Sequence, residues 1–250
     1  MKVGIIGVGN IGGTLAKKFA RAGHEVQVAA ARGASQIRQQ VEEMGAQAVE
    51  VTDVAKGVDV LILSVPFSAM PELASAVAKA RPDVVLIDTS NYYPFRDGQM
   101  AELDNGKPES VCSSEQIGRP VIKAFNAVLA FTLAERGLPA GAKGRLALPV
   151  AGDDSRGKAI AAELVEAAGF DAVDAGGLAE SWRQQPGNPA YCTELTSAEL
   201  RDALASAELG RGARKREELM AEFIAASAFP DHDTVIRRNR EVAATRDLAA

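Results

Sequence analysis

The sequence predicts an α/β fold of the Rossmann type: a doubly wound, mostly parallel sheet followed by a small C-terminal α/β and helical part. Three observations support this prediction. Short apolar segments alternate with amphipathic segments over the first two thirds of the chain, a glycine-rich turn follows the first apolar segment, and one more strand–helix–strand pattern begins after Arg145. We therefore expect one domain over residues 1–144 and a smaller one over residues 145–250.

Five apolar segments have the length and composition of strands that are buried on both faces. They are short and rich in Val, Ile and Leu, as expected for a parallel sheet that helices cover on both sides. The predicted strands are Val3–Gly7, Val26–Ala30, Val58–Val65, Val84–Thr89 and Val121–Phe125. Sheets of this kind bind ligands at the carboxyl ends of their strands, so the residues after each strand are the first candidates for a site.

The segments between these strands show helical periodicity. Thr14–Ala22 places Leu15 and Phe19 on one apolar stripe, and Gly23 stands where helices usually stop. Ser35 is expected to cap the next helix, Ser35–Met44. A third helix is predicted over Met70–Lys79, with Pro71 in its first turn, and a short one over Ser110–Ile117, inside a long polar excursion from Pro94 to Pro120.

The second part of the chain begins with another strand–helix–strand pattern. RLALPVAGDD and DAVDAG are the expected strands, and AIAAELVEAAG is the helix between them, ended by Gly169. Three further helices are predicted over Glu194–Glu208, Lys215–Ser227 and Asp233–Leu248. The last of them is expected to serve as a terminal cover or as a dimer arm.

Composition narrows the classes of function. The chain has 250 residues, of which 47% are hydrophobic, and its net charge is −5, whereas nucleic-acid binders are usually basic. Its two cysteines, Cys112 and Cys192, and its two histidines show no metal-ligand spacing. No apolar run is long enough for a membrane span and no cleavable signal is visible, so we expect a cytoplasmic protein without a metal, a nucleic-acid partner or a membrane anchor.

The glycine-rich turn GVGNIG predicts a dinucleotide-binding loop. Gly7 lets the strand turn sharply, Gly9 lets the backbone approach a pyrophosphate, and Gly12 lets the following helix pack on the strand. The helix also directs its N-terminal N–H groups and the positive end of its dipole at the phosphates. The alternative is a glycine-rich turn that binds no ligand.

The segment AAARG, which follows the second strand, predicts which dinucleotide is bound. NAD-binding turns usually carry an acidic residue here for the ribose hydroxyls, but this chain has Ala29–Ala31 and then Arg32. A guanidinium matches a 2′-phosphate with two charge-assisted hydrogen bonds, and the Ser35 hydroxyl would add a third contact. NADP(H) is therefore the expected cofactor, and the alternative is a solvated surface arginine.

Other residues leave the sheet at the same edge. Ser64, Val65 and Pro66 follow one strand, and Phe67 either lies beside the ribose and nicotinamide or closes the core. Asn91 and Asn126 follow two further strands, which suits Asn126 to contact a carboxamide or an acceptor ring. For Lys123 we expect a packed stem and an amine that reaches water.

These segments together resemble the coenzyme F-420-dependent NADP oxidoreductase family. The resemblance rests on KVGIIGVGNIGGTLAKKFARAGHEV, AAARG, LILSVPF, VIKAFNA and VAGDD with the helix and strand after it, and covers most of residues 1–181 in order. It implies hydride exchange between NADPH and a flat deazaflavin, often in a homodimer. By position it implies a phosphate loop of Gly7, Val8, Gly9, Asn10, Ile11 and Gly12, a 2′-phosphate site at Arg32, a nicotinamide path along Val65–Phe67, and Ala124 to Asn126 beside the nicotinamide.

The acceptor is less well determined than the cofactor. Tyr92, Tyr93 and Trp182 are placed to stack on a deazaflavin or flavin, or else they anchor loops to the core. Ala30 and Ala31 stand where family members often have a second polar residue, and the polar excursion is unusual for deazaflavin reductases. No acid–base residue is assigned: His24 is expected at a helix end and His232 in a loop. Alternatives are an imine or small-carbonyl reductase of the pyrroline-5-carboxylate reductase type, or a non-catalytic NADPH-binding redox sensor.

Overall fold

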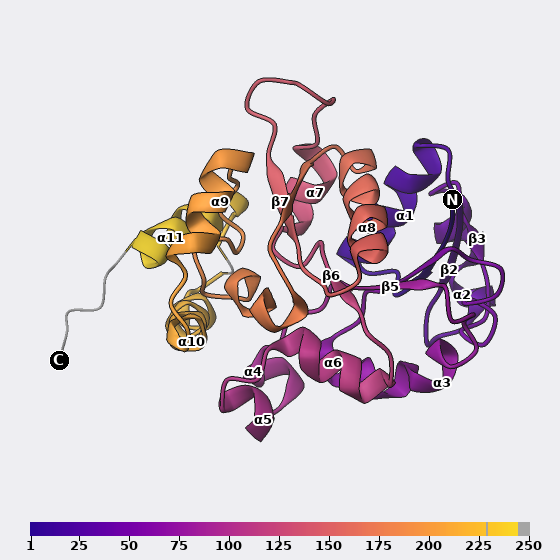
Figure 1. Ribbon diagram of the computed structural model, residues 1–250, viewed down its shortest axis with the longest axis horizontal. Helices are drawn as coiled ribbons and strands as arrows, with labels where there is room; N and C mark the ends of the chain where they lie inside the picture. Colours follow the sequence, from indigo (N-terminus) through magenta and orange to yellow (C-terminus); the bar gives the residue numbers. More distant parts are fainter. Residues whose placement is uncertain (229, 245–250) are drawn as a thin grey trace.

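A computed structural model describes residues 1–228 and 230–244 of the chain (Figure 1). Its central sheet has six parallel strands in the order β3-β2-β1-β4-β5-β6, which is the Rossmann order and confirms the predicted fold class. The strands are β1 (Lys2–Ile6), β2 (Glu25–Ala29), β3 (Gln47–Ala48), β4 (Val60–Leu63), β5 (Val85–Asp88) and β6 (Ile122–Lys123). Strand β3 is only two residues long and was not among the predicted strands.

Helices cover both faces of this sheet. On one face, α1 (Asn10–Arg21), α7 (Ala130–Glu135) and α8 (Ser155–Ala167) pack side by side, and α2 (Ala34–Glu42) lies over β2 and β3 (Figure 1). The other face is covered by the 3₁₀ helix η1 (Phe67–Leu73), α3 (Ala74–Val77) and α6 (Glu109–Ile117). Alternate residues of each strand join the two cores: Ile5 and Ile62 face α1, whereas Leu61 and Leu63 face η1.

Two helix starts differ from the prediction. Pro71 lies inside η1 rather than at the start of a regular helix, because a residue without an N–H group cannot continue an α-helical ladder. The cap of α2 is Gly33, with φ +89°, and Ser35 is the second residue of that helix, so the prediction that Ser35 caps it was wrong. The predicted stops at Gly23 and Gly169 are confirmed, since both glycines follow a helix end with positive φ.

A second, two-stranded sheet pairs β7 (Ala147–Val150) with β8 (Asp171–Asp174) in parallel, as the sequence predicts. Helix α8 connects the two strands, and α9 (Ser197–Ser206) packs against both. An antiparallel bridge between Lys123 and Ala151 joins this sheet to β6. Leu148 and Leu164 belong to the same apolar core as β1, so a domain boundary at residues 144 and 145 stays a prediction.

The remaining elements lie beyond the β5 and β6 end of the sheet. The polar excursion forms α4 (Pro94–Asp97), α5 (Ala101–Asp104) and α6, and the 3₁₀ helix η2 (Leu178–Gln184) packs against α6. Helices α10 (Arg211–Ala225) and α11 (His232–Ala244) pack on each other through Leu219, Phe223 and Val235, on the side of the molecule away from the N-terminus (Figure 1). The predicted last helix extends to Leu248, and its final residues lie outside the described part of the chain.

Candidate functional site

Two glycines of the loop between β1 and α1 are required by the fold itself. Gly7 has φ +113°, and a Cβ atom there would lie 2.0 Å from the carbonyl oxygen of Ser64. A Cβ atom on Gly12 would lie 2.2 Å from the carbonyl oxygen of Gly7. Only glycine allows β1, β4 and α1 to approach this closely, so these two positions carry no independent evidence of a ligand.

Gly9 is different, because nothing in the protein requires a glycine there. Its backbone is extended, with φ −72° and ψ −170°, and a Cβ atom would have no neighbour within 4 Å. Gly9 is also the N-cap of α1, whose first turn has neither a side-chain cap nor an acidic residue. An open backbone at an uncapped helix N-terminus is the geometry that admits a phosphate.

Arg32 lies beside this loop. The side chain is exposed, its Nη2 donates to Oε1 of Gln40 at 2.8 Å, and Nε2 of Gln40 lies 3.5 Å from the carbonyl oxygen of Val8. Val8, Gly9, Asn10 and Gln40 line a groove of about 380 Å³ together with residues of α1 and α2. Arg32 is thus connected through one side chain to the loop that would hold a pyrophosphate.

A carboxylate that the sequence analysis missed stands close to this position. Glu50, which follows β3, accepts a hydrogen bond at 3.1 Å from the backbone N–H of Ala34, the first residue of α2. A carboxylate therefore lies at the start of α2, although Ala29–Ala31 supply none. Its sequence position gave no signal, because the two-residue strand that places it has no apolar pattern of its own.

The other predicted cofactor contacts lie along the carboxyl edge with different exposures. Ser64, Val65 and Ile11 are half-buried, and Pro66 and Asn10 are exposed. Ala124 is fully buried beneath the edge and belongs to the apolar core. Ser35 is exposed on α2, two residues after Gly33. Contacts of these residues with a dinucleotide stay predictions.

Phe67 and Tyr92 are both buried and touch each other. Their rings meet edge to face with centroids 5.9 Å apart. The Tyr92 hydroxyl donates to Asp104 at 3.1 Å and accepts from the N–H of Met100 at 2.9 Å. Tyr92 therefore anchors the polar excursion in this structure, which leaves neither ring face open for stacking.

Asn91 and Asn126 join the ends of β5 and β6. Asn126 is 2% exposed, and its amide donates to Oδ1 of Asn91 at 3.0 Å and to the carbonyl oxygen of Gln184 at 2.8 Å. Its own Oδ1 accepts from Nε2 of Gln184 at 2.9 Å. This network fixes the two strand exits to η2, and a direct contact of Asn126 with a ligand stays a prediction.

Lys123 is not where the sequence analysis placed it. Its amine does not reach water: the side chain is fully buried, lies 3.3 Å from Oδ2 of Asp88 and donates to the carbonyl oxygen of Ser90. Burial by itself would raise the pKa of Asp88, but the Lys123 ammonium and the hydrogen bonds from Ser90 and Ser110 bring it below its ordinary value. The pair is a structural ion pair under the sheet edge.

A cavity of about 270 Å³ opens where the exits of β5 and β6 meet the C-terminal helices. Tyr93 comes from the β5 exit, Leu129 and Phe131 come from the β6 exit, and the segment Pro186–Tyr191 and helices α10 and α11 complete the wall. Most of the lining side chains are apolar. The polar ones are Arg216, His232, Asn239 and the Tyr93 and Tyr191 hydroxyls, which bond each other at 2.8 Å.

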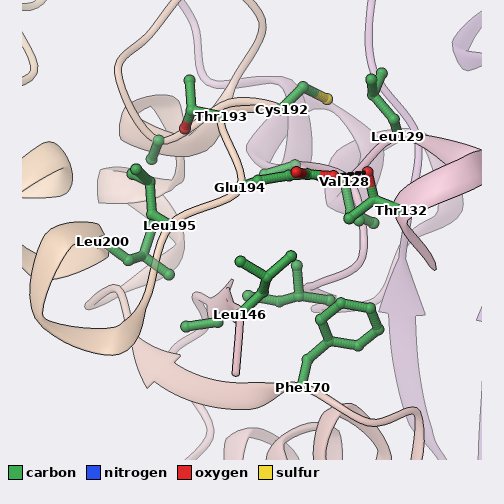
Figure 2. A pocket seen from close by; sticks show the side chains of 14 residues that line it. Val128, Leu129, Thr132, Leu146, Phe170, Cys192, Thr193, Glu194, Leu195 and Leu200 are labelled. Atoms are coloured by element: carbon green, nitrogen blue, oxygen red, sulfur yellow. Dashed lines mark hydrogen bonds between the residues drawn. The ribbon is translucent and has the colours of Figure 1, made fainter. Parts of the chain in front are cut away.

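His232 is the first residue of α11 rather than a loop residue, and it is paired with a carboxylate. Its Nε2 lies 3.0 Å from Oε1 of Glu194, and Oε1 also accepts from the Thr132 hydroxyl at 2.7 Å. Figure 2 shows Glu194 reaching Thr132 from the segment that carries Cys192 and Thr193. The apolar space beside this contact in Figure 2 has a volume of about 10 Å³, enough for no more than one water molecule.

Residues 2–92 match the family described as NADP oxidoreductase, coenzyme F420-dependent. The chain is also 40% identical over 105 residues to the protein YjhV of Escherichia coli K12. The matched region covers 42% of this chain and 77% of that protein. The crystal structure of a hypothetical protein, SMa0349 from Sinorhizobium meliloti, superposes with a TM-score of 0.67 at 31% identity, covering 78% of this chain and 95% of the other. The chain belongs to the F420-dependent NADP oxidoreductase family.

A solved structure with lower sequence identity to this chain supports the fold alone. A candidate F420-dependent NADP-reductase from Arthrobacter sp. FB24 has a TM-score of 0.60 at 23% identity and covers 73% of this chain and 87% of its own. The family match ends at Tyr92, just where β5 leads into the 270 Å³ cavity. The glycine-rich turn after β1 and the β4 exit therefore lie inside the family-matched region, and the described cavity walls lie outside it.

Two further observations concern membrane-spanning helices and metal sites among the described residues. Across residues 1–228 and 230–244, no helix combines the length and the apolar character that a membrane span needs. The same residues contain no group of three or more His, Cys, Asp or Glu side chains arranged to hold a metal ion.

Proposed function

We propose that this family member is an NADP(H)-dependent oxidoreductase that transfers a hydride between the nicotinamide and a small organic molecule at the carboxyl edge of the sheet. The observation that carries the proposal is the open Gly9 at the uncapped N-terminus of α1, with Arg32 beside it. No feature of the protein's own packing explains a glycine at that position, whereas the approach of a pyrophosphate does.

Different residues would bind the different parts of the cofactor. Gly7, Val8, Gly9, Asn10, Ile11 and Gly12 would hold the pyrophosphate, Arg32 the 2′-phosphate with Ser35 nearby, and Ser64, Val65 and Pro66 the path toward the nicotinamide. The bound dinucleotide would supply the hydride. The buried Phe67, Tyr92 and Asn126 and the half-buried Asn91 would act as positioning residues, because they fix the strand exits, and Ala124 would flank the nicotinamide.

The acceptor is the open part of this proposal. Coenzyme F420 or a flavin is the acceptor that the family resemblance implies. Trp182, which is half-buried under the guanidinium of Arg183, would stack on this acceptor. A small-carbonyl acceptor is the second candidate, favoured by the compact cavity between the strand exits and α10–α11. A non-catalytic NADPH sensor remains the outcome if NADPH binds and no acceptor is reduced.

A binding titration of NADPH and NADH tests the cofactor assignment. The wild-type protein is expected to prefer NADPH, and Arg32→Ala to lose about ten- to a hundredfold in NADPH affinity with little change for NADH, the effect of one charge-assisted pair of hydrogen bonds. Arg38→Ala is the matched control, because Arg38 is also exposed on α2. Equal affinities for the two nucleotides, or an unchanged preference in Arg32→Ala, would refute the assignment.

A further inference from the structure

The strongest unassigned feature of the molecule is the pair formed by His232 and Glu194 at the wall of the 270 Å³ cavity. Building on the proposed oxidoreductase function, we propose that the cavity binds a small, uncharged carbonyl compound and that His232, oriented by Glu194, exchanges the proton with the carbonyl oxygen. Neither residue lies in the family-matched segment, and the sequence analysis assigned no acid–base residue.

The first step of the argument is the orientation of the imidazole. A carboxylate only accepts hydrogen bonds, so the contact of 3.0 Å between Nε2 and Glu194 places a proton on Nε2. Nδ1 is then the nitrogen that gains or loses a proton during a reaction. Nδ1 is buried and has no hydrogen-bond partner among the described residues, while the His232 side chain lines the cavity.

The second step is the rigidity of the carboxylate. Glu194 has φ +52°, a left-handed conformation that is unfavourable for a residue with a long side chain. Two hydrogen bonds from Arg240 hold this backbone, one to the carbonyl oxygen of Thr193 at 2.7 Å and one to that of Glu194 at 2.9 Å. Thr132 fixes the carboxylate at 2.7 Å. Strain maintained by surrounding contacts in this way is common at functional sites.

The third step excludes the other polar groups of the cavity from the same role. Arg216 donates to Tyr92 and to Glu217, and an arginine does not deprotonate. Burial and nearby charge raise the pKa of Tyr93 and of Tyr191, so these hydroxyls keep their protons and bond each other. Asn239 donates to the backbone of its own helix. Among the described lining residues, His232 is the one whose side chain can both donate and accept a proton and is oriented by a carboxylate.

The fourth step selects the acceptor class. Among the described residues, the cavity lining is mostly apolar and includes no acidic side chain, while Arg216 contributes a guanidinium. A cationic iminium would find no carboxylate to pair with among the described lining residues, whereas a neutral carbonyl needs none. The volume of about 270 Å³ lies at the lower end of the range for small-molecule sites, which favours a compact compound over a tricyclic cofactor with a long side chain.

The chemistry balances with NADPH as the reductant. The carbonyl carbon accepts the hydride, the carbon–oxygen π bond breaks, and its electron pair remains on oxygen, which takes one proton from Nδ1 of His232. Water returns that proton to the imidazole. The sum is one carbonyl, one NADPH and one proton converted to one alcohol and one NADP⁺. Glu194 stabilises the imidazolium form and acts as a positioning residue.

Nuclear magnetic resonance of the ¹⁵N-histidine-labelled full chain tests the binding part directly. The protein has two histidines, so His24, which lies against the N-terminal amine, is an internal control. In the presence of NADP⁺, acetophenone is expected to give a hydrogen-bond shift of the Nδ1 resonance of His232 and leave the His24 resonances unchanged, whereas ethylbenzene, which lacks the oxygen, gives no hydrogen-bond shift at Nδ1. An unchanged His232 spectrum at the solubility limit of acetophenone overturns the proposal.

Two variants then separate this inference from the proposed function. His232→Gln is expected to bind NADPH with wild-type affinity and to lose about a hundredfold or more in the rate of NADPH oxidation by acetophenone, the usual contribution of a general acid. Glu194→Gln should lower the same rate and alter the His232 tautomer in the spectrum, and His24→Gln should change neither. If wild-type protein fails to bind NADPH, the proposed function fails; if NADPH binds and His232→Gln reduces acetophenone normally, only the role of His232 fails.

Discussion

At the scale of single residues, the glycines of the phosphate loop show how the same residue type serves two purposes. Gly7 and Gly12 are forced by the contact between two strands and a helix, and Gly9 is free of any such contact. A sequence motif treats the three as equivalent. The structure separates the positions that maintain the fold from the one that would contact a ligand.

This difference predicts opposite outcomes for two alanine substitutions. Gly9→Ala should leave the free energy of unfolding within about 0.5 kcal/mol of wild type and lower NADPH affinity at least about tenfold, because the added methyl group takes the space of the pyrophosphate. Gly7→Ala should cost more than about 2 kcal/mol of stability through backbone strain and overpacking. Urea unfolding and NADPH titration measure both, and a Gly9→Ala protein with unchanged affinity would contradict the site.

Glu50 is the second residue whose effect can be stated in advance. Its carboxylate at the N-terminus of α2 would repel a 2′-phosphate held by Arg32. Glu50→Gln should therefore raise NADPH affinity about fivefold, the factor that corresponds to about 1 kcal/mol, and change NADH affinity little. Glu42→Gln is the control, because Glu42 is an exposed glutamate at the other end of α2. The expectation fails if both nucleotides gain equally.

At the scale of secondary-structure elements, a buried ion pair positions the exits of β5 and β6. Asp88 at the end of β5 bonds Ser90, Ser110 and Ser113 as well as Lys123 of β6, so β5, β6 and α6 share one polar cluster. Glu109 belongs to the same cluster, because its Oε2 lies 4.0 Å from the Lys123 amine, and burial raises its pKa. The ion pair and hydrogen bonds of this cluster thus hold in place the strand exits that line the proposed acceptor cavity.

Removing one partner of this pair should be costly. Lys123→Met is expected to destabilise the protein by about 3–5 kcal/mol, because Asp88 would remain buried without its counter-ion, and the double change with Asp88→Asn should recover part of that loss. Lys17→Met, at an exposed position of α1, should have an effect within about 0.5 kcal/mol. Chemical denaturation of wild type, Lys123→Met, Asp88→Asn and the double variant measures the coupling, and additive losses would show that the pair is not coupled.

The same pair sets a pH dependence. The pKa of Asp88 is lower in the folded than in the unfolded chain, so the stability it contributes is present above the unfolded-state pKa, roughly 4, and is lost as the pH falls through the folded-state value. The difference in the free energy of unfolding between wild type and Lys123→Met should accordingly be largest at neutral pH and decrease in acid. A difference independent of pH down to the acid transition would exclude the ion pair as its source.

At the scale of the whole molecule, the Rossmann sheet supplies one half of the site and the C-terminal helices supply the other. Helices α10 and α11 lie far along the chain from the strand exits, yet they close the cavity that those exits open. The family resemblance implies a homodimer as well. Light scattering is expected to give a mass near twice 26.2 kDa at micromolar concentration, and a mass of one chain would refute this prediction.

Sequence alone determined the Rossmann-type fold class, the glycine-rich turn after β1 and the arginine that follows β2, because strands, turns and helix starts are encoded by short local patterns. It did not determine that Lys123 is buried against Asp88, that Glu50 stands at the start of α2, or that His232 meets Glu194. Each of these contacts joins residues between 16 and 38 positions apart. Only the packing of the whole chain decides which of many distant polar side chains come within hydrogen-bond distance, and a local pattern carries no record of that choice.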